Sequence, residues 1–284
     1  MHLETEVEAF RSYCNDARRR GKRLGLVPTM GALHRGHLSL VDTARRAGAE
    51  CIALSIFVNP TQFAAHEDLD RYPRDLDSDL RQCESSGVDL VFAPDAAQMY
   101  PKEVSASVRV DGVSLPLEGK FRPEHFQGVA TVLTQFFCIT GPCVAVFGRK
   151  DYQQWRVVES LVQALHLPVD IRSSPIVRAS DGLALSSRNR FLSESERSKA
   201  NALYKALEWA NVAWSKGERS AKVLTEGVVS HLHPLDHVDY AEIADPQNLH
   251  TQRGVLESSP VVLIAGRVGK TRLIDNHVLG EQLP

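Results

Sequence analysis

Two histidines, His34 and His37, stand three residues apart in the glycine-containing segment PTMGALHRGH, residues 28–37. Histidines at this spacing can hold a metal ion, transfer a proton or donate hydrogen bonds to a phosphate. A zinc site needs a third and a fourth ligand, and the neighbouring sequence offers no convincing one. Spacing alone leaves these chemistries open, beside the interpretation that both residues are ordinary loop histidines.

Two other segments carry side chains suited to an anionic ligand. In GRKDYQQ (148–154), Lys150 could neutralise phosphate charge and Asp151 could accept hydrogen bonds from sugar hydroxyls, although a surface ion pair is the plain alternative. In LSSRNR (185–190), two serines and an arginine suit contact with phosphate, and a turn with helix-capping serines fits equally well.

Three further patterns are weaker. RYPRDLDSD (71–79) is typical of a turn followed by an acidic helix start, and Asp79 could also contact a magnesium ion. AGRVGKT (265–271) resembles a phosphate-binding loop, but Ile264 stands where that motif requires glycine. The histidines of HLHPLDH (231–237) are interrupted by Pro234 and lack Cys or Glu partners, so a solvated helix end is favoured.

Alternating strands and helices must position these residues. Apolar runs predict strands at 24–28, 52–58, 88–94 and 144–148, and helical periodicity predicts helices at 37–48, 75–87, 128–140 and 152–166. Strand–helix–strand units make neighbouring strands parallel, so the fold class is α/β with a doubly wound, Rossmann-like sheet. Ligands of such sheets bind at the carboxyl ends of the strands, where the polar segments begin. A Gly-x-Gly-x-x-Gly fingerprint is missing after the first strand, which disfavours a redox dinucleotide.

The pattern changes after residue 176. Two amphipathic helices, at 195–217 and 220–233, precede predicted strands at 238–245, 260–269 and 271–278. We therefore expect two domains, a catalytic α/β domain over residues 1–176 and a smaller α+β domain over residues 177–284.

Composition narrows the class of protein. The 284 residues carry 33 Lys and Arg against 35 Asp and Glu, which gives no basic excess for nucleic-acid binding. Five scattered cysteines indicate reduced thiols rather than a disulfide scaffold. The amino terminus does not read as a signal peptide, and no apolar run reaches the about 18 to 20 residues that span a bilayer. We expect a cytoplasmic protein that binds neither nucleic acid nor membrane.

Taken together, these segments resemble the pantothenate synthetase family, the AMP-forming pantoate–β-alanine ligases. The matching segments follow the family's order over nearly the whole chain: VPTMGALHRGH (27–37), SIFVNPTQF (55–63), RYPR (71–74), VDLVFAP (88–94), LEGKFRPEHFQGV (117–129), FGRKDYQQ (147–154), DGLALSSRN (181–189) and RLIDN (272–276). HRGH corresponds to the HIGH signature of the nucleotidyltransferase superfamily. The resemblance implies a Rossmann-like catalytic domain and a smaller lid domain.

The resemblance also implies the reaction. The carboxylate of pantoate would attack the α-phosphorus of Mg-ATP, release pyrophosphate and leave pantoyl adenylate. The amine of β-alanine would then attack the acyl carbon, which gives pantothenate and AMP. The implied cofactors are ATP and Mg²⁺, and the implied assembly is a homodimer. No protein nucleophile is needed, because the protein positions the reactants and stabilises charge.

Residue roles follow from the same resemblance. The catalytic residues would be His34, His37 and Lys150, with His37 the usual proton donor. The ATP-binding residues would be Met30, Gly31, His34, Gly36, His37, Gly148, Lys150, Asp151, Val177, Leu185, Ser186, Ser187 and Arg188. Pantoate and β-alanine would be bound by Asn59, Gln62, Tyr72, Arg122 and Gln154. Asp79 is the candidate metal ligand, with Mg²⁺ held mainly by the phosphates of ATP.

The chain departs from the family pattern in places. Arg149 replaces the glutamate of the usual Gly-Glu-Lys-Asp motif, and Leu185 replaces a common methionine. Two rival functions remain open: another adenylate- or cytidylate-forming enzyme of the superfamily, and a nucleotide sensor without turnover. The glutamines of NPTQF and KDYQQ favour a small hydroxy acid over the first rival. The intact histidines and Lys150 favour catalysis over the second.

Overall fold

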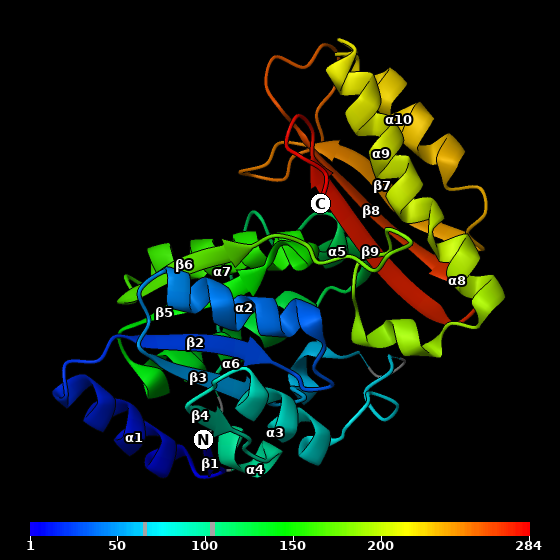
Figure 1. Cartoon of the computed structure of the whole chain (residues 1–284). Helices are drawn as coiled ribbons and strands as arrows, with labels where there is room; N and C mark the ends of the chain where they lie inside the picture. The colour runs from blue at the N-terminus through cyan, green and yellow to red at the C-terminus, as the bar shows by residue number, and fades with distance from the viewer. Residues whose placement is uncertain (65–66, 103–105) are drawn as a thin grey trace. The chain divides into compact units, whose positions relative to one another are not determined.

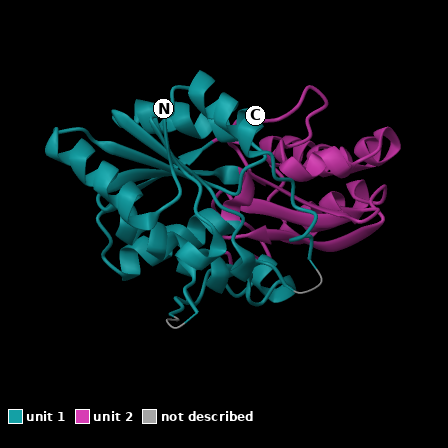
Figure 2. Ribbon diagram, turned by 90° about the horizontal axis from the view of Figure 1, so that it is seen from below, with its two compact units in different colours: residues 1–149, 153–174 teal, residues 150–152, 175–284 magenta. Residues whose placement is uncertain are grey.

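The computed structural model describes residues 1–64, 67–102 and 106–284. These divide into two compact units (Figure 2). The first unit contains residues 1–149 and 153–174, and the second contains residues 150–152 and 175–284. The division falls near residue 175, but the short segment Lys150–Tyr152 groups with the second unit, which the sequence did not indicate.

A six-stranded parallel sheet forms the centre of the first unit, in the order β1-β4-β3-β2-β5-β6 (Figure 1). Its strands are β1 His2–Glu4, β2 Leu24–Thr29, β3 Cys51–Ile56, β4 Leu90–Phe92, β5 Cys143–Gly148 and β6 Val169–Ser174. The strand order reverses direction between β2 and β5, which is the topological switch point of a doubly wound sheet. The predicted Rossmann-like fold class is confirmed, whereas β1 and β6 were not predicted.

Helices cover both faces of this sheet. Their bounds are α1 Val7–Arg19, α2 Arg35–Arg46, α3 Leu76–Ser85, α4 Ala96–Met99, α5 Glu118–Phe121, α6 His125–Thr140 and α7 Tyr152–Ala164, with single 3₁₀ turns η1 Pro60–Gln62 and η2 Arg149–Asp151. One hydrophobic cluster joins α1, α6 and α7 to one face, and a second joins α2 and α3 to the other.

Alternation along the strands explains the two clusters. On β2, Leu26 packs into the first cluster and Val27 into the second, and on β5 Ala145 and Val146 do the same. Side chains of successive strand residues point to opposite faces, so a strand buried on both faces must be apolar throughout. Each fully buried Val or Leu contributes about 1.5 to 3 kcal/mol, and this fixes the strand ends in place.

The second unit is an antiparallel sheet covered by helices. Strands β7 His237–Ala244, β8 Val261–Val268 and β9 Thr271–Val278 pair in sequence order. Helices α8 Glu194–Ala200, α9 Ala202–Ser215 and α10 Ala221–His231 bury their apolar faces with Val262, Ile264 and Leu273 of the sheet. The predicted helix 195–217 is divided at Asn201, which ends α8 and begins α9.

Two of the weaker sequence patterns, AGRVGKT and HLHPLDH, lie in regular secondary structure of this unit or at its ends. The segment AGRVGKT forms the end of β8 and a two-residue hairpin into β9, with Gly269 at a positive φ of 55°. His231 ends α10, and His237 begins β7. Within residues 1–64, 67–102 and 106–284, no helix is long and apolar enough to cross a membrane.

Candidate active site

The sequence motifs of the first unit gather at its topological switch point. Strands β2 and β5 are parallel neighbours, with Gly25 opposite Val144 and Leu26 opposite Ala145. Their carboxyl ends therefore lie at the same edge of the sheet (Figure 1). The histidine turn leaves β2 at this edge, and Gly148 ends β5 there. A crevice at this position is where doubly wound folds bind nucleotides.

A buried carboxylate shapes the turn that follows β2. The Oδ2 atom of Asp79 accepts the backbone N–H of Ala32 at 2.8 Å, and its Oδ1 atom accepts that of Leu33 at 2.8 Å. Gly31 has a φ of 79°, and a Cβ atom there would lie 2.8 Å from Asp79 Oδ2. Glycine is required at this position both by the positive φ and by the close approach of the carboxylate.

These contacts give Asp79 a structural use, and its role as a metal ligand stays a prediction. The side chain is buried, with 2% exposure, and both of its oxygens accept backbone donors. Among the described residues, no group of three or more His, Cys, Asp or Glu side chains could hold a metal ion. The structure gives Asp79 the role of holding the turn that presents the two histidines.

His34 and His37 lie at the amino end of α2. His34 is the N-cap residue, and its Nδ1 atom accepts the backbone N–H of Gly36 at 3.1 Å. An Nδ1 atom that accepts a hydrogen bond leaves the proton of the neutral ring on Nε2. The two rings stack, with centroids 4.0 Å apart and planes at 30°. Imidazole donors at a helix amino end, beside the first backbone N–H groups of the helix, suit a phosphate.

Asn59, Tyr72 and Arg122, three of the predicted acid-binding residues, lie near Gln62, which ends the 3₁₀ turn η1 after β3. Its Oε1 atom accepts Asn59 Nδ2 at 3.2 Å, and its Nε2 atom lies 3.0 Å from the sulfur of Met30. Asn59 also donates to the carbonyl of Gly128 at 3.1 Å, which ties this segment to α6. Tyr72 is buried and stacks edge-on against Phe63, the residue after Gln62. Met30, Asn59 and Gln62 thus form one connected group.

Arg122 also contacts this group. It donates to both carboxylate oxygens of Glu67, at 2.6 and 2.8 Å, and to the carbonyl of Gln62 at 3.3 Å. Burial alone would raise the pKa of Glu67, but the hydrogen bond and charge of Arg122 outweigh it and lower that pKa. His125 Nδ1 lies 2.9 Å from the carbonyl of Gln62. Burial, assisted by the charge of Arg122, lowers the pKa of His125 to about 4, so the ring is neutral and donates.

The two adjacent glutamines at the start of α7, Gln153 and Gln154, differ in burial and in hydrogen bonding. Gln153 is buried, accepts the N–H of Glu118 at 3.0 Å and donates to the carbonyls of Val113 and Pro116 at 2.9 and 2.7 Å. Gln154 is only partly buried, and among the described residues it makes no side-chain hydrogen bond to Met30, Asn59 or Gln62. Gln153 therefore has a structural role, whereas the structure does not assign one to Gln154.

In the second unit, Lys150 and Asp151 pair with each other. Their Nζ and Oδ1 atoms lie 3.3 Å apart, and the side chains are 21% and 48% exposed, so the ion pair itself contributes little to stability. The backbone is held more firmly, because Asn276 Nδ2 donates to the carbonyl of Lys150 at 2.8 Å. Tyr152 donates to the carbonyl of Pro246 at 3.2 Å.

The serine–arginine segment of the second unit leaves a narrow hairpin. Leu185 N–H donates to the carbonyl of Val177 and Ala179 N–H to that of Leu183, both at 2.9 Å. Ser186 follows and caps the 3₁₀ turn η3, Ser187–Phe191, by accepting the N–H of Arg188 at 3.3 Å. Ser186, Ser187 and Arg188 therefore follow directly on Leu185, whose backbone is hydrogen-bonded to Val177.

Four residues that support the predicted ones within each unit were not identified from the sequence. Glu67, Glu118 and His125 support Arg122 and Gln62, and Arg178 supports the hairpin through its side chain. Glu118 and His125 lie inside the segment LEGKFRPEHFQGV, so the motif marked them, but only the tertiary contacts show what they bind.

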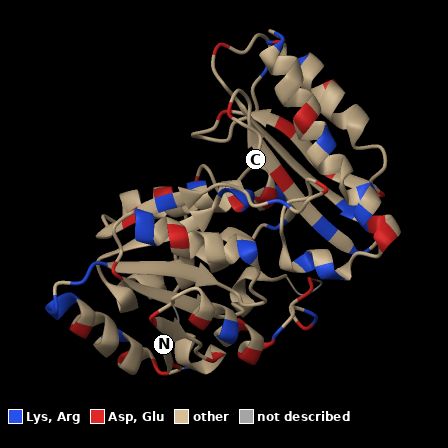
Figure 3. Ribbon diagram, in the orientation of Figure 1, with Lys and Arg blue, Asp and Glu red and all other residues tan. Residues whose placement is uncertain are grey.

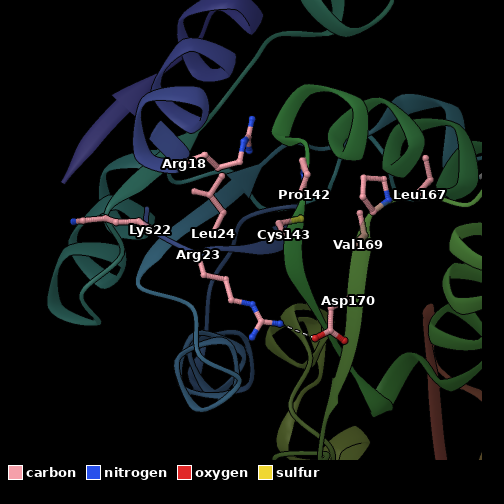
Figure 4. A pocket seen from close by; sticks show the side chains of 10 residues that line it. Arg18, Lys22, Arg23, Leu24, Pro142, Cys143, Leu167, Val169 and Asp170 are labelled. Atoms are coloured by element: carbon pink, nitrogen blue, oxygen red, sulfur yellow. Dashed lines mark hydrogen bonds and ion pairs between the residues drawn. The ribbon is translucent and has the colours of Figure 1, made fainter. Parts of the chain in front are cut away.

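A separate pocket of about 540 Å³ opens at the other ends of the strands (Figure 4). It is lined by Arg18, Lys22, Arg23, Leu24, Pro142, Cys143, Leu167, Pro168, Val169 and Asp170. Leu24, Cys143 and Val169 begin β2, β5 and β6, so this pocket lies at the amino edge of the sheet. Two of the lining residues, Arg23 and Asp170, form an ion pair at 2.9 Å. None of the predicted site residues lines this pocket, and basic and acidic residues are interspersed on both units (Figure 3).

Comparison with known proteins assigns the whole chain. A model of the family described as pantoate-beta-alanine ligase matches residues 2–278. Pantothenate synthetase of Rhodopirellula baltica is 47% identical over 282 residues, which is 98% of this chain and 99% of that protein. The pantothenate synthetase of Aquifex aeolicus is also 47% identical, over 96% of this chain and 97% of its own length.

Solved structures agree with the sequence comparison. A crystal structure of pantothenate synthetase from Thermus thermophilus matches with a TM-score of 0.92 and 40% identity, over 98% of this chain and 99% of that chain. Pantoate-beta-alanine ligase from Francisella tularensis, solved in complex with beta-gamma ATP and beta-alanine, matches with a TM-score of 0.81 and 31% identity over both full chains.

Proposed function

Because the chain belongs to the pantoate-beta-alanine ligase family, we infer that it joins pantoate to β-alanine in an ATP-dependent reaction. The products are pantothenate, AMP and pyrophosphate. A carboxylate and an amine do not condense in water without activation, so ATP must first turn the carboxylate into a better acyl donor. The nucleotide-binding position of the histidine turn supports activation as an adenylate.

The first step is attack of a pantoate carboxylate oxygen on the α-phosphorus of ATP. The bond from this phosphorus to the bridging oxygen breaks, and pyrophosphate leaves with both electrons. Negative charge develops on the phosphoryl oxygens, so catalysis depends on donors already aimed at them. We assign this task in the first unit to His34, His37 and the backbone N–H groups at the amino end of α2.

Other residues of the first unit would hold the nucleotide backbone. Gly31 and Gly36 allow the chain to approach the phosphates closely, and Met30 and Gly148 border them at the ends of β2 and β5. The carboxylate of Asp79 keeps this turn fixed, so the donors need no reorganisation during the reaction.

Residues of the second unit are assigned the rest of ATP. Lys150 would neutralise phosphate charge, and Asp151 would accept from the ribose hydroxyls. Val177 and Leu185 would border the adenine, while Ser186, Ser187 and Arg188 would contact the β- and γ-phosphates. Arginine and serine donors suit phosphate oxygens because they form charge-assisted and hydroxyl hydrogen bonds.

The Gln62 group would bind the two acids. Gln62 and Gln154 are assigned the carboxylate and hydroxyls of pantoate, with Asn59 and Tyr72 beside them. Arg122 is assigned to the carboxylate end of the acid pocket, where its pairing with Glu67 fixes the guanidinium. In the second step the amine of β-alanine attacks the acyl carbon of pantoyl adenylate, and the acyl–oxygen bond breaks to release AMP.

Magnesium enters as part of the substrate, Mg-ATP. The described residues offer no carboxylate cluster for a resident ion, and Asp79 already accepts two backbone donors. Phosphate oxygens are good ligands for Mg²⁺, which usually keeps several waters. We further propose a cytoplasmic homodimer, supported by five free cysteines, all in described positions, and by the family resemblance.

One observation carries this function: a histidine-capped helix follows the strand at the switch point, in a chain that matches the family over residues 2–278. The test is AMP release from Mg-ATP with pantoate and β-alanine, each omitted in turn. We expect AMP only with pantoate and rapid turnover only with both acids. Equal AMP release without pantoate would exclude the proposed reaction.

A further inference from the structure

A buried ion pair lies at the base of the serine–arginine segment in the second unit. Arg178 Nη1 and Nη2 donate to Asp275 Oδ2 and Oδ1 at 2.7 and 3.1 Å, so the contact is bidentate. The side chains are 5% and 1% exposed. Arg178 belongs to the hairpin that leads to Ser186, and Asp275 belongs to β9. The pair therefore joins a loop-forming segment to a regular strand.

Two further contacts hold the terminal part of the Arg178 guanidinium, whereas its Nε atom has no hydrogen-bond partner among the described residues. Its Nη1 atom also donates to the carbonyl of Gly182 at 3.1 Å, and its guanidinium lies 5.0 Å from the ring centroid of Tyr204. Gly182 has a φ of 89°, and a Cβ there would lie 2.4 Å from the same tyrosine ring. Arg178, Gly182 and Tyr204 thus fix the tip of the hairpin on α9, while Asp275 fixes its base on β9.

The neighbouring residue on β9 supports a second segment. Asp275 Oδ1 accepts the backbone N–H of Asn276 at 2.8 Å, and Asn276 Nδ2 donates to the carbonyl of Lys150 at 2.8 Å. Consecutive residues of one strand thus contact both the hairpin of Val177 and Leu185 and the backbone of Lys150. Strand β9 is regular along its whole pairing with β8, so it offers a rigid base.

We propose that Arg178 and Asp275 are a positioning pair, which holds Val177 and Ser186–Arg188 in register with Lys150 for ATP. This proposal rests on the nucleotide roles assigned to those residues above. Neither member of the pair is assigned a contact with substrate. The pair acts through the hairpin, because Leu185 donates to Val177 and Ser186 follows at once. A displacement of about 1 Å in such groups can slow catalysis a hundredfold.

Single and double replacements of the buried ion pair can distinguish a role in positioning ATP-binding residues from a role in protein stability alone. Removing one partner of a buried pair leaves an uncompensated charge and is strongly destabilising. Replacing both partners by apolar side chains of similar size is often neutral for stability. The double replacement Arg178→Met with Asp275→Leu should therefore fold better than either single variant. It lacks the bidentate guanidinium–carboxylate contact that orients the hairpin.

The test compares wild type, both single variants and this double variant. A matched control is Lys199→Met with Asp236→Leu, which removes a 2.8 Å ion pair elsewhere in the second unit. Melting temperature, kcat, and KM for ATP and β-alanine are measured for each. Partial unfolding lowers kcat in proportion to the folded fraction and leaves KM unchanged, so KM for ATP reports positioning.

We expect the double variant to melt near wild type while its KM for ATP rises about tenfold or more and its KM for β-alanine stays the same. The control should match wild type in both constants. A double variant with wild-type KM for ATP and wild-type kcat would overturn the proposal.

Two further measurements keep the test decisive. If the double variant does not fold, Arg178→Lys is used, because lysine keeps the positive charge but cannot form the bidentate contact. We expect this variant to fold and to have a raised KM for ATP. An unchanged KM for ATP would overturn the proposal. The Kd for a non-hydrolysable Mg-ATP analogue is measured by calorimetry in all variants. If wild type binds the analogue but forms no AMP, the proposed reaction fails, whereas unchanged analogue binding in the variants overturns the positioning pair alone.

Discussion

The carboxylate of Asp79 lies 2.8 Å from the amide nitrogen of Leu33, although the two residues are 46 positions apart in the chain. The same carboxylate accepts the amide of Ala32. A helix on one side of the sheet thereby fixes the turn that carries the histidines, so the geometry of this turn depends on a residue outside it.

Asp79→Asn should impair catalysis through this turn. An asparagine presents an NH₂ group to one of the two backbone donors, so one hydrogen bond is lost and a donor is left unpaired, at a stability cost of about 1 to 3 kcal/mol. We expect kcat to fall about tenfold or more. The control is Asp77→Asn, an exposed position on the same helix. The Mg²⁺ concentration for half-maximal rate should not change, and a large rise in it would support Asp79 as a metal ligand instead.

The two histidines can be separated by substitutions that treat the helix cap differently. Asparagine is a good N-cap residue, so His34→Asn should keep the melting temperature while it removes the imidazole donor. His37→Ala does not alter the cap and should reduce pantoate-dependent pyrophosphate release about a hundredfold, because a preorganised donor is lost. Single-turnover rates of adenylate formation in both variants show how much each histidine contributes to catalysis. Wild-type rates for His37→Ala would remove that residue from the catalytic role.

Stability should depend on pH through His125. Burial lowers its pKa from 6.5 to about 4, so between these values the unfolded chain binds a proton that the folded chain does not. Its contribution is constant above pH 6.5 and is lost as the pH falls toward 4, by about 2 kcal/mol at pH 5. His125→Asn keeps a donor for the Gln62 carbonyl and does not titrate. Urea unfolding at pH 7.5 and 5.0 should show a smaller loss for the variant than for wild type, and equal losses would contradict this role of His125.

Arg149 stands where the family usually has glutamate, and the structure gives its side chain a local role. Its Nε atom donates to Ser173 Oγ at 3.2 Å, and its guanidinium lies 5.6 Å from the ring centroid of Trp155. Arg149→Gln should lower the free energy of unfolding by about 1 kcal/mol, the usual value of one such contact. KM for ATP should stay within about threefold of wild type. A tenfold rise would mean that the side chain itself contacts the nucleotide.

The sequence predicted those parts of the molecule that depend on neighbours in the chain. The apolar runs before HRGH and GRKD predicted strands β2 and β5. Because the strands were expected to be parallel, the sequence also predicted that both motifs lie at the carboxyl edge of the sheet. Strand β6 was missed because VDIRSS is polar at alternate positions and mostly half-buried, so it lacks the apolar run of a central strand. The break at Asn201 was missed because its φ of −63° and ψ of −14° remain nearly helical, and side-chain periodicity continues across it.

Contacts between residues far apart in the chain could not be predicted from the sequence. The hydrogen bonds of Asp79 were missed, since an acidic residue after a turn has no visible partner until the fold brings the 32–33 backbone to it. The role of Arg178 depends on Asp275, 97 positions away. The grouping of Lys150 with the second unit likewise depends on Asn276, which only tertiary structure places beside it.

Activation of pantoate as an adenylate is tested most directly by isotope transfer. Pantoate labelled with ¹⁸O in its carboxylate is incubated with Mg-ATP, β-alanine and the enzyme, and AMP is analysed by mass spectrometry. We predict one labelled oxygen in each AMP, because the attacking carboxylate oxygen stays on the α-phosphorus when the acyl–oxygen bond breaks. Unlabelled AMP, or label in inorganic phosphate with ADP as the second product, would contradict activation as an adenylate.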